Sequence, residues 1–363
     1  MKRLRLAAIS ILSVLLVACA PPPKTAAPGI CGSGIATAAP PSTAAATKLE
    51  TVQVAIIPIP DVAPAKLAEH CGYFAAEGLK IQWAPIHGAS DAIPGLQNGN
   101  LHVSLWNYVT AYATEAAQPG LARLIADAYA ATENTFLLMV RRDSPLQSLA
   151  DLKWNGSGEK VTVGVATLKS VSTLTTERTL QVAGVSADDI TFVKIPLPEM
   201  AAAVQNGRVD VGWFTEPSIT YFKKEFNGRT LADVATGPTN QWPVAGWAVS
   251  AKWAAQRPDL VVRFQRALAR GQELAALDDS TVKKILPTYA NHIDAATASS
   301  ITLGQFPITL NPTRLQRVGD AMLELSKGAK DPYLTKPIDA ADLIWDPSLS
   351  ASPTVSSSPG STP

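Results

Sequence analysis

Polar and aromatic side chains suited to holding a small ligand recur in short segments that directly follow apolar, strand-like stretches. They offer carboxylate, imidazole, hydroxyl, amide and indole groups, which bind ligands by hydrogen bonding and stacking. The candidate ligand-binding residues are Asp61, His87, Ser90, Trp106, Asn107, Thr167, Ser170, Ser172, Trp213 and Glu216. Lys169 and backbone N–H groups at a helix start near residues 167–172 also offer a place for an anionic group.

Each candidate also has an ordinary structural explanation. Ser170 can cap a helix, as Ser and Thr do at many helix starts; Asp61 can cap the helix after it, and His87 can lie in a turn. Glu216 before Pro217 fits a helix N-terminus, with Pro217 at the first helical position and the carboxylate favoured by the helix dipole. A single tryptophan is more often part of a core than of a ligand site.

Metal binding and catalysis are not expected from the cysteine and histidine positions. The four histidines are scattered, and no cysteine–histidine spacing suits a metal, so we expect neither a metal nor another cofactor. His70 and Cys71 are adjacent, but no base is placed to activate the thiol, so we do not expect an enzyme. Cys31 and Cys71 can pair outside the cytoplasm, or remain a free and a buried cysteine, and the sequence leaves both possibilities open.

The charge balance excludes one class of partner. The chain has 31 basic and 30 acidic residues, a formal net charge of +1, and no basic run. A nucleic-acid partner is therefore not expected.

A repeated pattern predicts the elements that must position the candidate residues. Segments that open with Val-x-Val begin at Val52 and at Val161, and each leads into a helical stretch and a second short strand. Each copy continues through a short helix that ends in Gln-Asn-Gly, at Gly99 or Gly207, and then a third strand. The order β-α-β-α-β thus occurs twice along the chain, which predicts two α/β lobes with mainly parallel sheets. In such sheets ligands bind beyond the carboxyl ends of the strands, where the candidate residues lie.

Two crossings between the lobes are expected to form a hinge beside an interlobe cleft. The apolar run "FLLMV" at 136–140 is predicted to be the last strand of the first lobe before the chain crosses. The crossings are expected near 136–146 and 242–250. The predicted lobes are residues 49–140 with 246–345, and residues 141–245. A cleft between two such lobes suits a small ligand, and hinge closure around it is a common motion.

The ends of the chain have the composition of export and tethering segments. Residues 1–19 combine a basic start with an apolar stretch, and the run Leu-Val-Ala before Cys19 resembles a bacterial lipobox, which implies lipidation of that cysteine. A plain secretory signal with an incidental cysteine is the alternative. Residues 20–48 are rich in Ala and Pro and predict a flexible tether, and residues 346–363 predict a disordered tail. We therefore expect an extracytoplasmic protein anchored to the cell membrane by lipid.

Three segments together resemble the nitrate/sulfonate/taurine-type solute-binding proteins of ABC importers, a group related to binders of thiamine-pyrimidine precursors. The segments are "IIPIPDVAPAKLAEHCGYFAAEGLKI", "SPLQSLADLKWNGSGEKVTVGVATLKS" and "AAAVQNGRVDVGWFTEPSIT", and the resemblance spans roughly residues 50–330. It implies a type II periplasmic-binding-protein fold and capture of a sulfonate, nitrate, taurine or pyrimidine ligand by lobe closure. It also implies delivery to a permease with its ATPase. The ligand loops implied by position are 58–61, 87–90, 106–107, 167–172 and 213–216.

The sequence departs from the family pattern in two places. The segment "DLKWNGSGEKV" carries an insertion, and the cleft loops contain no Arg, which weakens the case for sulfonate or nitrate. A ligand-sensing lipoprotein has the same site with a different partner, and remains an alternative. An enzyme similar to thiamine-pyrimidine synthases is a weaker alternative, because their Cys-rich active segment is absent here. We expect the protein to be a monomer.

Replacing Cys19 by Ser should release the protein from membranes, because the lipid would have no attachment site. Fractionation of cells expressing the wild type and the Cys19→Ser variant measures this directly. Retention of the variant in the membrane fraction would contradict the lipobox interpretation.

Overall fold

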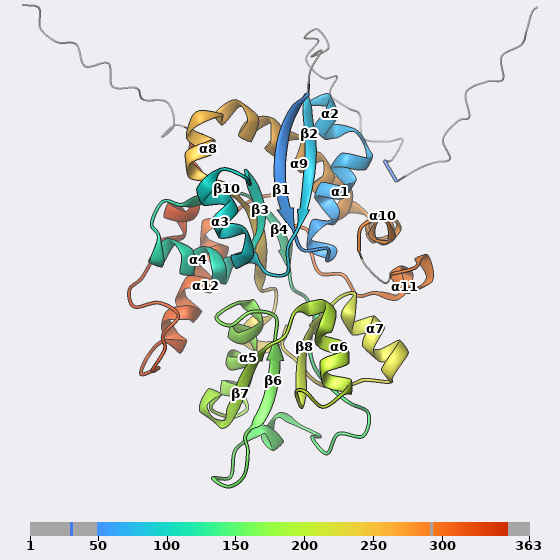
Figure 1. The fold of residues 1–363 in the computed structure, drawn as a ribbon, viewed down its shortest axis with the longest axis vertical. Helices are drawn as coiled ribbons and strands as arrows, with labels where there is room; N and C mark the ends of the chain where they lie inside the picture. The colour runs from blue at the N-terminus through green and yellow to red at the C-terminus, as the bar shows by residue number, and fades with distance from the viewer. Residues whose placement is uncertain (1–29, 32–48, 291–292, 348–363) are drawn as a thin grey trace, which may run out of the picture.

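The structure is a computed structural model that describes residues 30–31, 49–290 and 293–347. The predicted signal peptide at 1–19 with Cys19, most of the tether and nearly all of the tail lie outside the described residues. The described chain forms two lobes, one above the other in Figure 1, each built around a five-stranded sheet.

The first lobe holds a sheet with the strand order β2-β1-β3-β10-β4, and the second lobe a sheet with the order β7-β6-β8-β5-β9. The strands of the first sheet are β1 (Glu50–Ile56), β2 (Leu79–Pro85), β3 (Val103–Asn107), β4 (Ala122–Ala130) and β10 (Pro243–Ser250). Those of the second sheet are β5 (Phe136–Val140), β6 (Val161–Val165), β7 (Ile190–Lys194), β8 (Val211–Thr215) and β9 (Arg229–Asp233). In both sheets the first three strands are parallel and the fourth runs antiparallel to its neighbours.

The internal repeat predicted from the sequence is present in the strand pairing. Val54 of β1 is paired with Val103 of β3, and Val163 of β6 is paired with Val211 of β8. The short helix before β3 ends at Gly99 with φ 82°, and the equivalent Gly207 has φ 70°. Glycine reaches this left-handed conformation without the steric cost that a Cβ would impose, as the Gln-Asn-Gly repeat predicts.

The crossings lie at residues 131–135 and 234–242, between β4 and β5 and between β9 and β10. The strand 136–140 is hydrogen-bonded to β8 and β9, so it belongs to the second lobe and not to the first, where the sequence analysis places it. The whole of β10 from Pro243 pairs within the first sheet, so the second boundary also lies earlier than expected. A fully buried apolar strand carries no alternation that would assign it to one sheet or the other.

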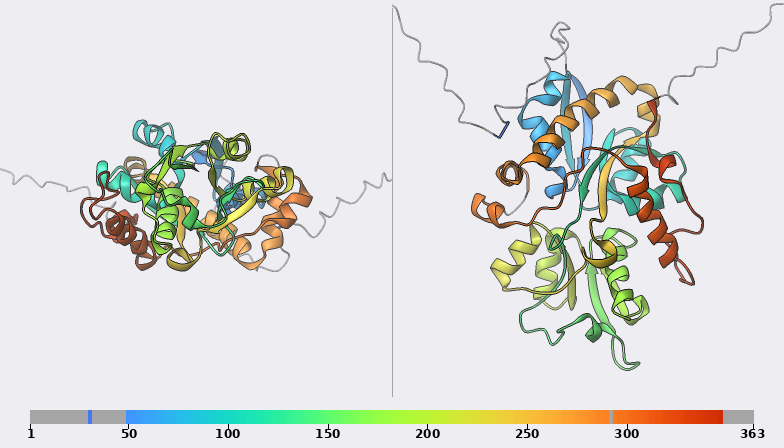
Figure 2. Two further views of the ribbon diagram at one scale, coloured as in Figure 1. Left: turned by 90° about the horizontal axis from the view of Figure 1, so that it is seen from below. Right: turned by 180° about the vertical axis from the view of Figure 1, so that it is seen from behind.

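Helices cover both sheets, and the C-terminal ones pack on the first lobe (Figure 2). The helices before residue 230 are α1 (Ala63–His70), α2 (Tyr73–Ala76), α3 (Ile93–Asn98), α4 (Tyr108–Ala117), α5 (Val171–Val182), α6 (Leu197–Gln205) and α7 (Ser218–Phe226). The later ones are α8 (Ala251–Gln256), α9 (Pro258–Leu277), α10 (Asp279–Ile285), α11 (Ala295–Ser300) and α12 (Pro312–Leu325). The long helix α9 packs on α1, and α12 packs on α4 and also reaches α5 of the second lobe.

Cys31 and Cys71 form a disulfide, which settles the choice that the sequence leaves open. The bond attaches residue 31 to the end of α1. Neither cysteine is therefore a free thiol.

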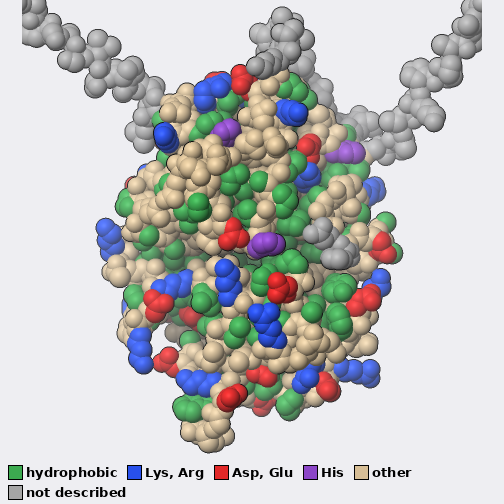
Figure 3. Space-filling model, viewed as in Figure 1, with side chains coloured by type: hydrophobic (Ala, Val, Ile, Leu, Met, Phe, Trp, Pro, Cys, Tyr) green, Lys and Arg blue, Asp and Glu red, His purple; other side chains and the backbone are tan. Residues whose placement is uncertain are grey.

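Two features of the described residues bear on the surroundings of the protein. None of the helices in that part of the chain combines the length and the apolar character needed to cross a membrane. On the face shown in Figure 3, acidic and basic side chains are interspersed without a patch of one sign, consistent with the balanced charge of the sequence.

Candidate functional site

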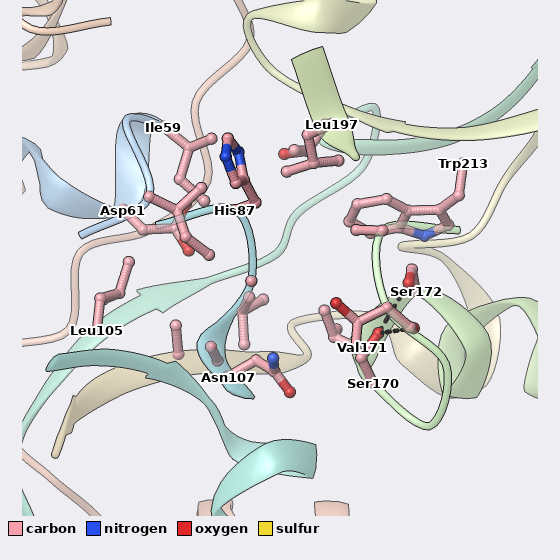
Figure 4. Close-up of a pocket in the computed structure, with 18 of the residues that line it drawn as sticks. Ile59, Asp61, His87, Leu105, Asn107, Ser170, Val171, Ser172, Leu197 and Trp213 are labelled. Carbon is pink, nitrogen blue, oxygen red and sulfur yellow. Dashed lines mark hydrogen bonds between the residues drawn. The ribbon is translucent and has the colours of Figure 1, made fainter. Parts of the chain in front are cut away.

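A cavity lies between the two lobes at the carboxyl ends of the parallel strands. The space between its walls is about 590 Å³, a volume that includes open solvent. Seven of the ten candidate residues line it: Asp61, His87, Asn107, Thr167, Ser170, Ser172 and Trp213. Figure 4 labels six of them, all but Thr167, and shows these six gathered from both lobes around one space.

One wall of the cavity is aromatic. The rings of Trp213 and Phe136 are tilted against each other with centroids 4.6 Å apart, and both residues line the cavity. The indole Nε1 of Trp213 donates to Thr175 Oγ1 of α5 at 3.1 Å, which fixes the orientation of the ring. A held ring of this kind can pack on a flat or apolar ligand group with little loss of side-chain entropy.

Among the described residues Asp61 is the one acidic residue that lines the cavity, and it is almost fully buried. It lies in the short 3-10 turn η1 (Pro60–Val62) directly after β1. Burial raises the pKa of its carboxyl from 3.8 to about 7, although a backbone hydrogen bond opposes the shift. Among the described residues no cation forms an ion pair with it. Up to about neutral pH the carboxyl is therefore protonated, and can both donate and accept a hydrogen bond.

Asn107 ends β3 and caps α4. Its Oδ1 accepts from the backbone N–H of Thr110 at 2.9 Å, which leaves the amide nitrogen as a donor toward the cavity. Asn107 thus combines the capping role with a lining role.

The lobes approach one another closely where Gly88 faces Thr167. A Cβ placed on Gly88 would lie 2.8 Å from Thr167 Oγ1, so only glycine allows this approach without a shift of the threonine. Gly88 comes from the loop after β2 of the first lobe and Thr167 from the loop after β6 of the second, so the contact joins strand-end loops of the two lobes.

The hydroxyl groups at the start of α5 are largely used within the loop itself. Ser170 Oγ donates to the carbonyl oxygen of Thr167 at 2.6 Å and lies 2.9 Å from Ser172 Oγ. Thr173 Oγ1 accepts from the backbone N–H of Ser170 at 2.9 Å, so this segment is a capped helix start as well as a wall of the cavity.

Lys169 does not line the cavity. Its Nζ forms an ion pair with Asp331 and donates to the carbonyl oxygen of Pro332 at 3.1 Å, in the chain after α12. Because no other Lys or Arg lines the cavity either, its described lining carries no positive charge for an oxyanion.

His87 lies at the edge of the cavity between Ile59 and Leu197, as Figure 4 shows. Its backbone N–H and that of Gly88 donate to Asp91 Oδ2, so the loop is held by a turn while the imidazole remains exposed. The backbone of His87 can thus form the turn while its imidazole contacts a ligand.

The structure does not bring Ser90, Trp106 or Glu216 to the cavity. Ser90 lies in the turn η2 (Ala89–Ala92), one residue beyond the lining. Trp106 faces the opposite side of the first sheet, because its neighbours Leu105 and Asn107 face the cavity and side chains alternate along a strand. There it shares a small cavity with Ala111 of α4.

Glu216 is buried at the start of α7 and acts as a local acceptor. Its carboxylate accepts from Thr220 N at 3.1 Å, Thr220 Oγ1 at 2.9 Å and Thr302 N at 3.2 Å. Burial raises its pKa, and the hydrogen bonds from Thr220 and Thr302 oppose that shift. This arrangement is the helix-terminus role weighed in the sequence analysis, although the helix begins at Ser218, one residue later than expected.

Several lining residues were not among the candidates. Thr215 of β8 is the strand equivalent of Asn107, and the alternation of β8 would have identified it. Phe136, Val244 and Ala245 begin the strands that follow the crossings, and no local pattern marks them. The described residues contain no group of three or more His, Cys, Asp or Glu side chains arranged to hold a metal ion.

The two lobes and their matching sheets define the two-lobed α/β fold of the periplasmic-binding-protein type, as predicted. The chain belongs to the NMT1/THI5-like family, which it matches over residues 59–279, more than half of its length. It is 28% identical over 287 residues to the riboflavin-binding protein RibY of Chloroflexus aurantiacus, covering 75% of this chain and 74% of that protein.

Solved structures share the fold at low sequence identity. The alkanesulfonate-binding protein SsuA from Xanthomonas axonopodis pv. citri, bound to MOPS, superposes with a TM-score of 0.66 at 18% identity, covering 83% of this chain and 99% of that chain. The desulfurization enzyme DSZB superposes with a TM-score of 0.58 at 17% identity, covering 81% and 96%. Because binding proteins and an enzyme share the fold, the fold alone does not decide the activity.

Replacing Asp61 by Asn should change how stability depends on pH. Between pH 4 and 7 the folded wild type keeps a proton on Asp61 that the unfolded chain has lost, so its free energy of unfolding falls as the pH rises. The free energy of unfolding of the variant does not contain this decrease. Relative to that of the wild type it should therefore rise by up to about 4 kcal/mol between pH 4 and 7. Denaturant unfolding of both proteins without ligand at pH 4.5, 6 and 8 measures the difference.

Burial also raises the pKa of Glu177 to about 7, so only the difference between the two proteins reports on Asp61. A difference that does not change with pH would contradict the buried, protonated carboxyl.

Replacing Glu216 by Ala should destabilise the fold rather than the ligand complex. Three donors, on the half-buried Thr220 and the exposed Thr302, would lose their buried acceptor, at a cost of about 1–3 kcal/mol in the free energy of unfolding. The exposed Glu225 on the same helix provides the control, because its replacement by Ala should change stability by about 0.5 kcal/mol or less. If Glu216→Ala kept full stability but lost ligand affinity, Glu216 would have to be assigned to the ligand-binding site.

Proposed function

We propose that this chain is the extracytoplasmic solute-binding component of an ABC importer, which captures a small ligand by lobe closure and delivers it to a permease with its ATPase. Membership of the NMT1/THI5-like family and the two-lobed fold support the binding role. The proposal includes export by the signal peptide, a lipid anchor at Cys19 and a monomeric state.

The ligand that best suits the cavity is flat, heteroaromatic and uncharged. The observation that carries this choice is the lining itself: an aromatic wall, apolar side chains, hydroxyl and amide groups, and a single carboxyl that burial keeps protonated up to about pH 7. A ring can pack on Trp213, while Asp61 and Asn107 offer hydrogen bonds to ring nitrogen and carbonyl groups. The similarity to a riboflavin-binding protein agrees with such a ligand.

An oxyanion suits this cavity less well. Sulfonate and nitrate carry a full charge, and burying such a charge without a positive partner is costly. Lys169 is engaged with Asp331, and no Lys or Arg is among the described residues that line the cavity.

The alternatives differ from this proposal in chemistry or in partner. An enzyme of the thiamine-pyrimidine-synthase type would need a nucleophile, and Cys31 and Cys71 are joined in a disulfide. A ligand-sensing lipoprotein would use the same cavity. Genes for a permease and an ATPase beside this gene would favour import, and a sensor-kinase gene would favour sensing.

A thermal-shift screen of the purified protein tests the ligand class. Riboflavin and uracil represent flat uncharged ligands, and taurine, an alkanesulfonate and nitrate represent the other classes. A flat ligand present at about 100 times its Kd should stabilise the fold by about 2.7 kcal/mol and raise the melting temperature. Trp213→Ala should remove the shift, whereas Trp154→Ala should keep it, because Trp154 is an exposed tryptophan away from the cavity.

Two outcomes would contradict the proposal in different ways. A shift with the sulfonate or nitrate and none with the flat ligands would overturn the uncharged ligand but keep a binding protein. No shift with any member of the screen would count against the transport function itself.

A further inference from the structure

A second cavity adjoins the first on the outer side of the cleft. The space between its walls is about 940 Å³, including open solvent, and no Asp, Glu, Lys or Arg is among the described residues that line it. Its polar lining consists of His87, Ser218 and Tyr221, and the rest is apolar. We call it the outer groove, and the cavity at Trp213 the inner pocket.

The outer groove and the inner pocket are continuous. Ile57, Ile59, His87 and Leu197 line both of them. In Figure 4, Ile59 and His87 from the first lobe and Leu197 from the second lie side by side, so the passage between the two spaces is framed by both lobes. A ligand that occupies both spaces would contact this neck from each side.

The walls of the outer groove are rigid and belong to the same strand ends as the inner pocket. Pro58, Pro85, Pro198 and Pro217 line it, and they lie at or within four residues of the ends of β1, β2, β7 and β8. Proline fixes φ, so these loops lose little backbone entropy when a ligand packs on them. Rigid apolar walls of this kind can pack against ligand atoms.

We infer that the ligand has two parts, a flat ring in the inner pocket and an uncharged chain that passes the neck at His87 and lies in the outer groove. This inference rests on the proposed function, because it extends the same site. No Asp, Glu, Lys or Arg is among the described residues that line the groove, so it offers no fixed charge to pair with a phosphate or carboxylate, and an uncharged chain suits it better. The three polar residues can meet hydroxyl groups, and the prolines and isoleucines can cover the carbon atoms of the chain.

Lumiflavin and riboflavin provide matched probes, because they share one ring system and differ in a methyl group against a hydroxylated five-carbon chain. The wild type should bind riboflavin about tenfold or more tightly than lumiflavin, measured by calorimetry or by flavin fluorescence. Ser218→Trp places a bulky group in the outer groove and should remove most of this advantage, while the affinity for lumiflavin changes by about threefold or less.

Two further variants complete the comparison. Lys223→Trp puts the same bulk on an exposed position of α7 that lines neither space, and should leave both affinities unchanged. Trp213→Ala should weaken both flavins alike, because both use the inner pocket. Retained lumiflavin binding by Ser218→Trp would show that this variant is folded.

Three results would overturn the inference. Equal wild-type affinities for the two flavins, or an equal loss of both in Ser218→Trp, would show that the chain does not occupy the groove while leaving the proposed function intact. Failure of the wild type to bind either flavin would overturn the flat-ring assignment in the proposed function, and this inference with it.

Discussion

Each lobe is completed by a strand that the chain inserts directly after crossing from the other lobe. β5 follows the first crossing and is hydrogen-bonded between β8 and β9, and β10 follows the second and is hydrogen-bonded between β3 and β4. A strand bonded on both sides is costly to detach, because its buried backbone groups would lose their partners. The crossings are therefore anchored at their ends, and any rotation between lobes must be absorbed at residues 131–135 and 234–242.

The same inserted strands also form the floor of the inner pocket. Phe136 begins β5, and Val244 and Ala245 lie at the start of β10. A ligand that packs on this floor and on loops of both lobes binds one arrangement of the lobes better than another, and differential contact of this kind is what shifts a conformational equilibrium. The position of the crossings thus links occupancy of the pocket to the arrangement of the lobes.

The parallel strands and the helix ends of the repeat can be predicted from the sequence, but the direction of the aromatic side chains differs from the prediction. The strand register aligns Val103 with Val211, which places Leu105 opposite Trp213 and Trp106 opposite Phe214. The two tryptophans therefore lie on opposite faces of their sheets, and only Trp213 reaches the pocket. Matching by aromatic type pairs Trp106 with Trp213, whereas position in the strand pairs Trp106 with Phe214. Position in the strand also pairs Asn107 with Thr215, which matching by type does not identify.

The rest of the site depends on contacts between residues far apart in the chain, which local patterns do not encode. Lys169 meets Asp331, 162 positions later, and Arg178 of α5 meets Glu324 of α12 at 2.9 Å. In the sequence, a lysine in a polar loop after a strand is equally consistent with an anion site and with an ion pair. The fold shows that Lys169 forms an ion pair between the lobes. Exposed ion pairs of this kind contribute about 0–1 kcal/mol each, so they can favour contact between the lobes without locking them. These two ion pairs therefore serve the lobe contact, and under the proposed function the choice of ligand depends on shape, aromatic packing and hydrogen bonds in the pocket.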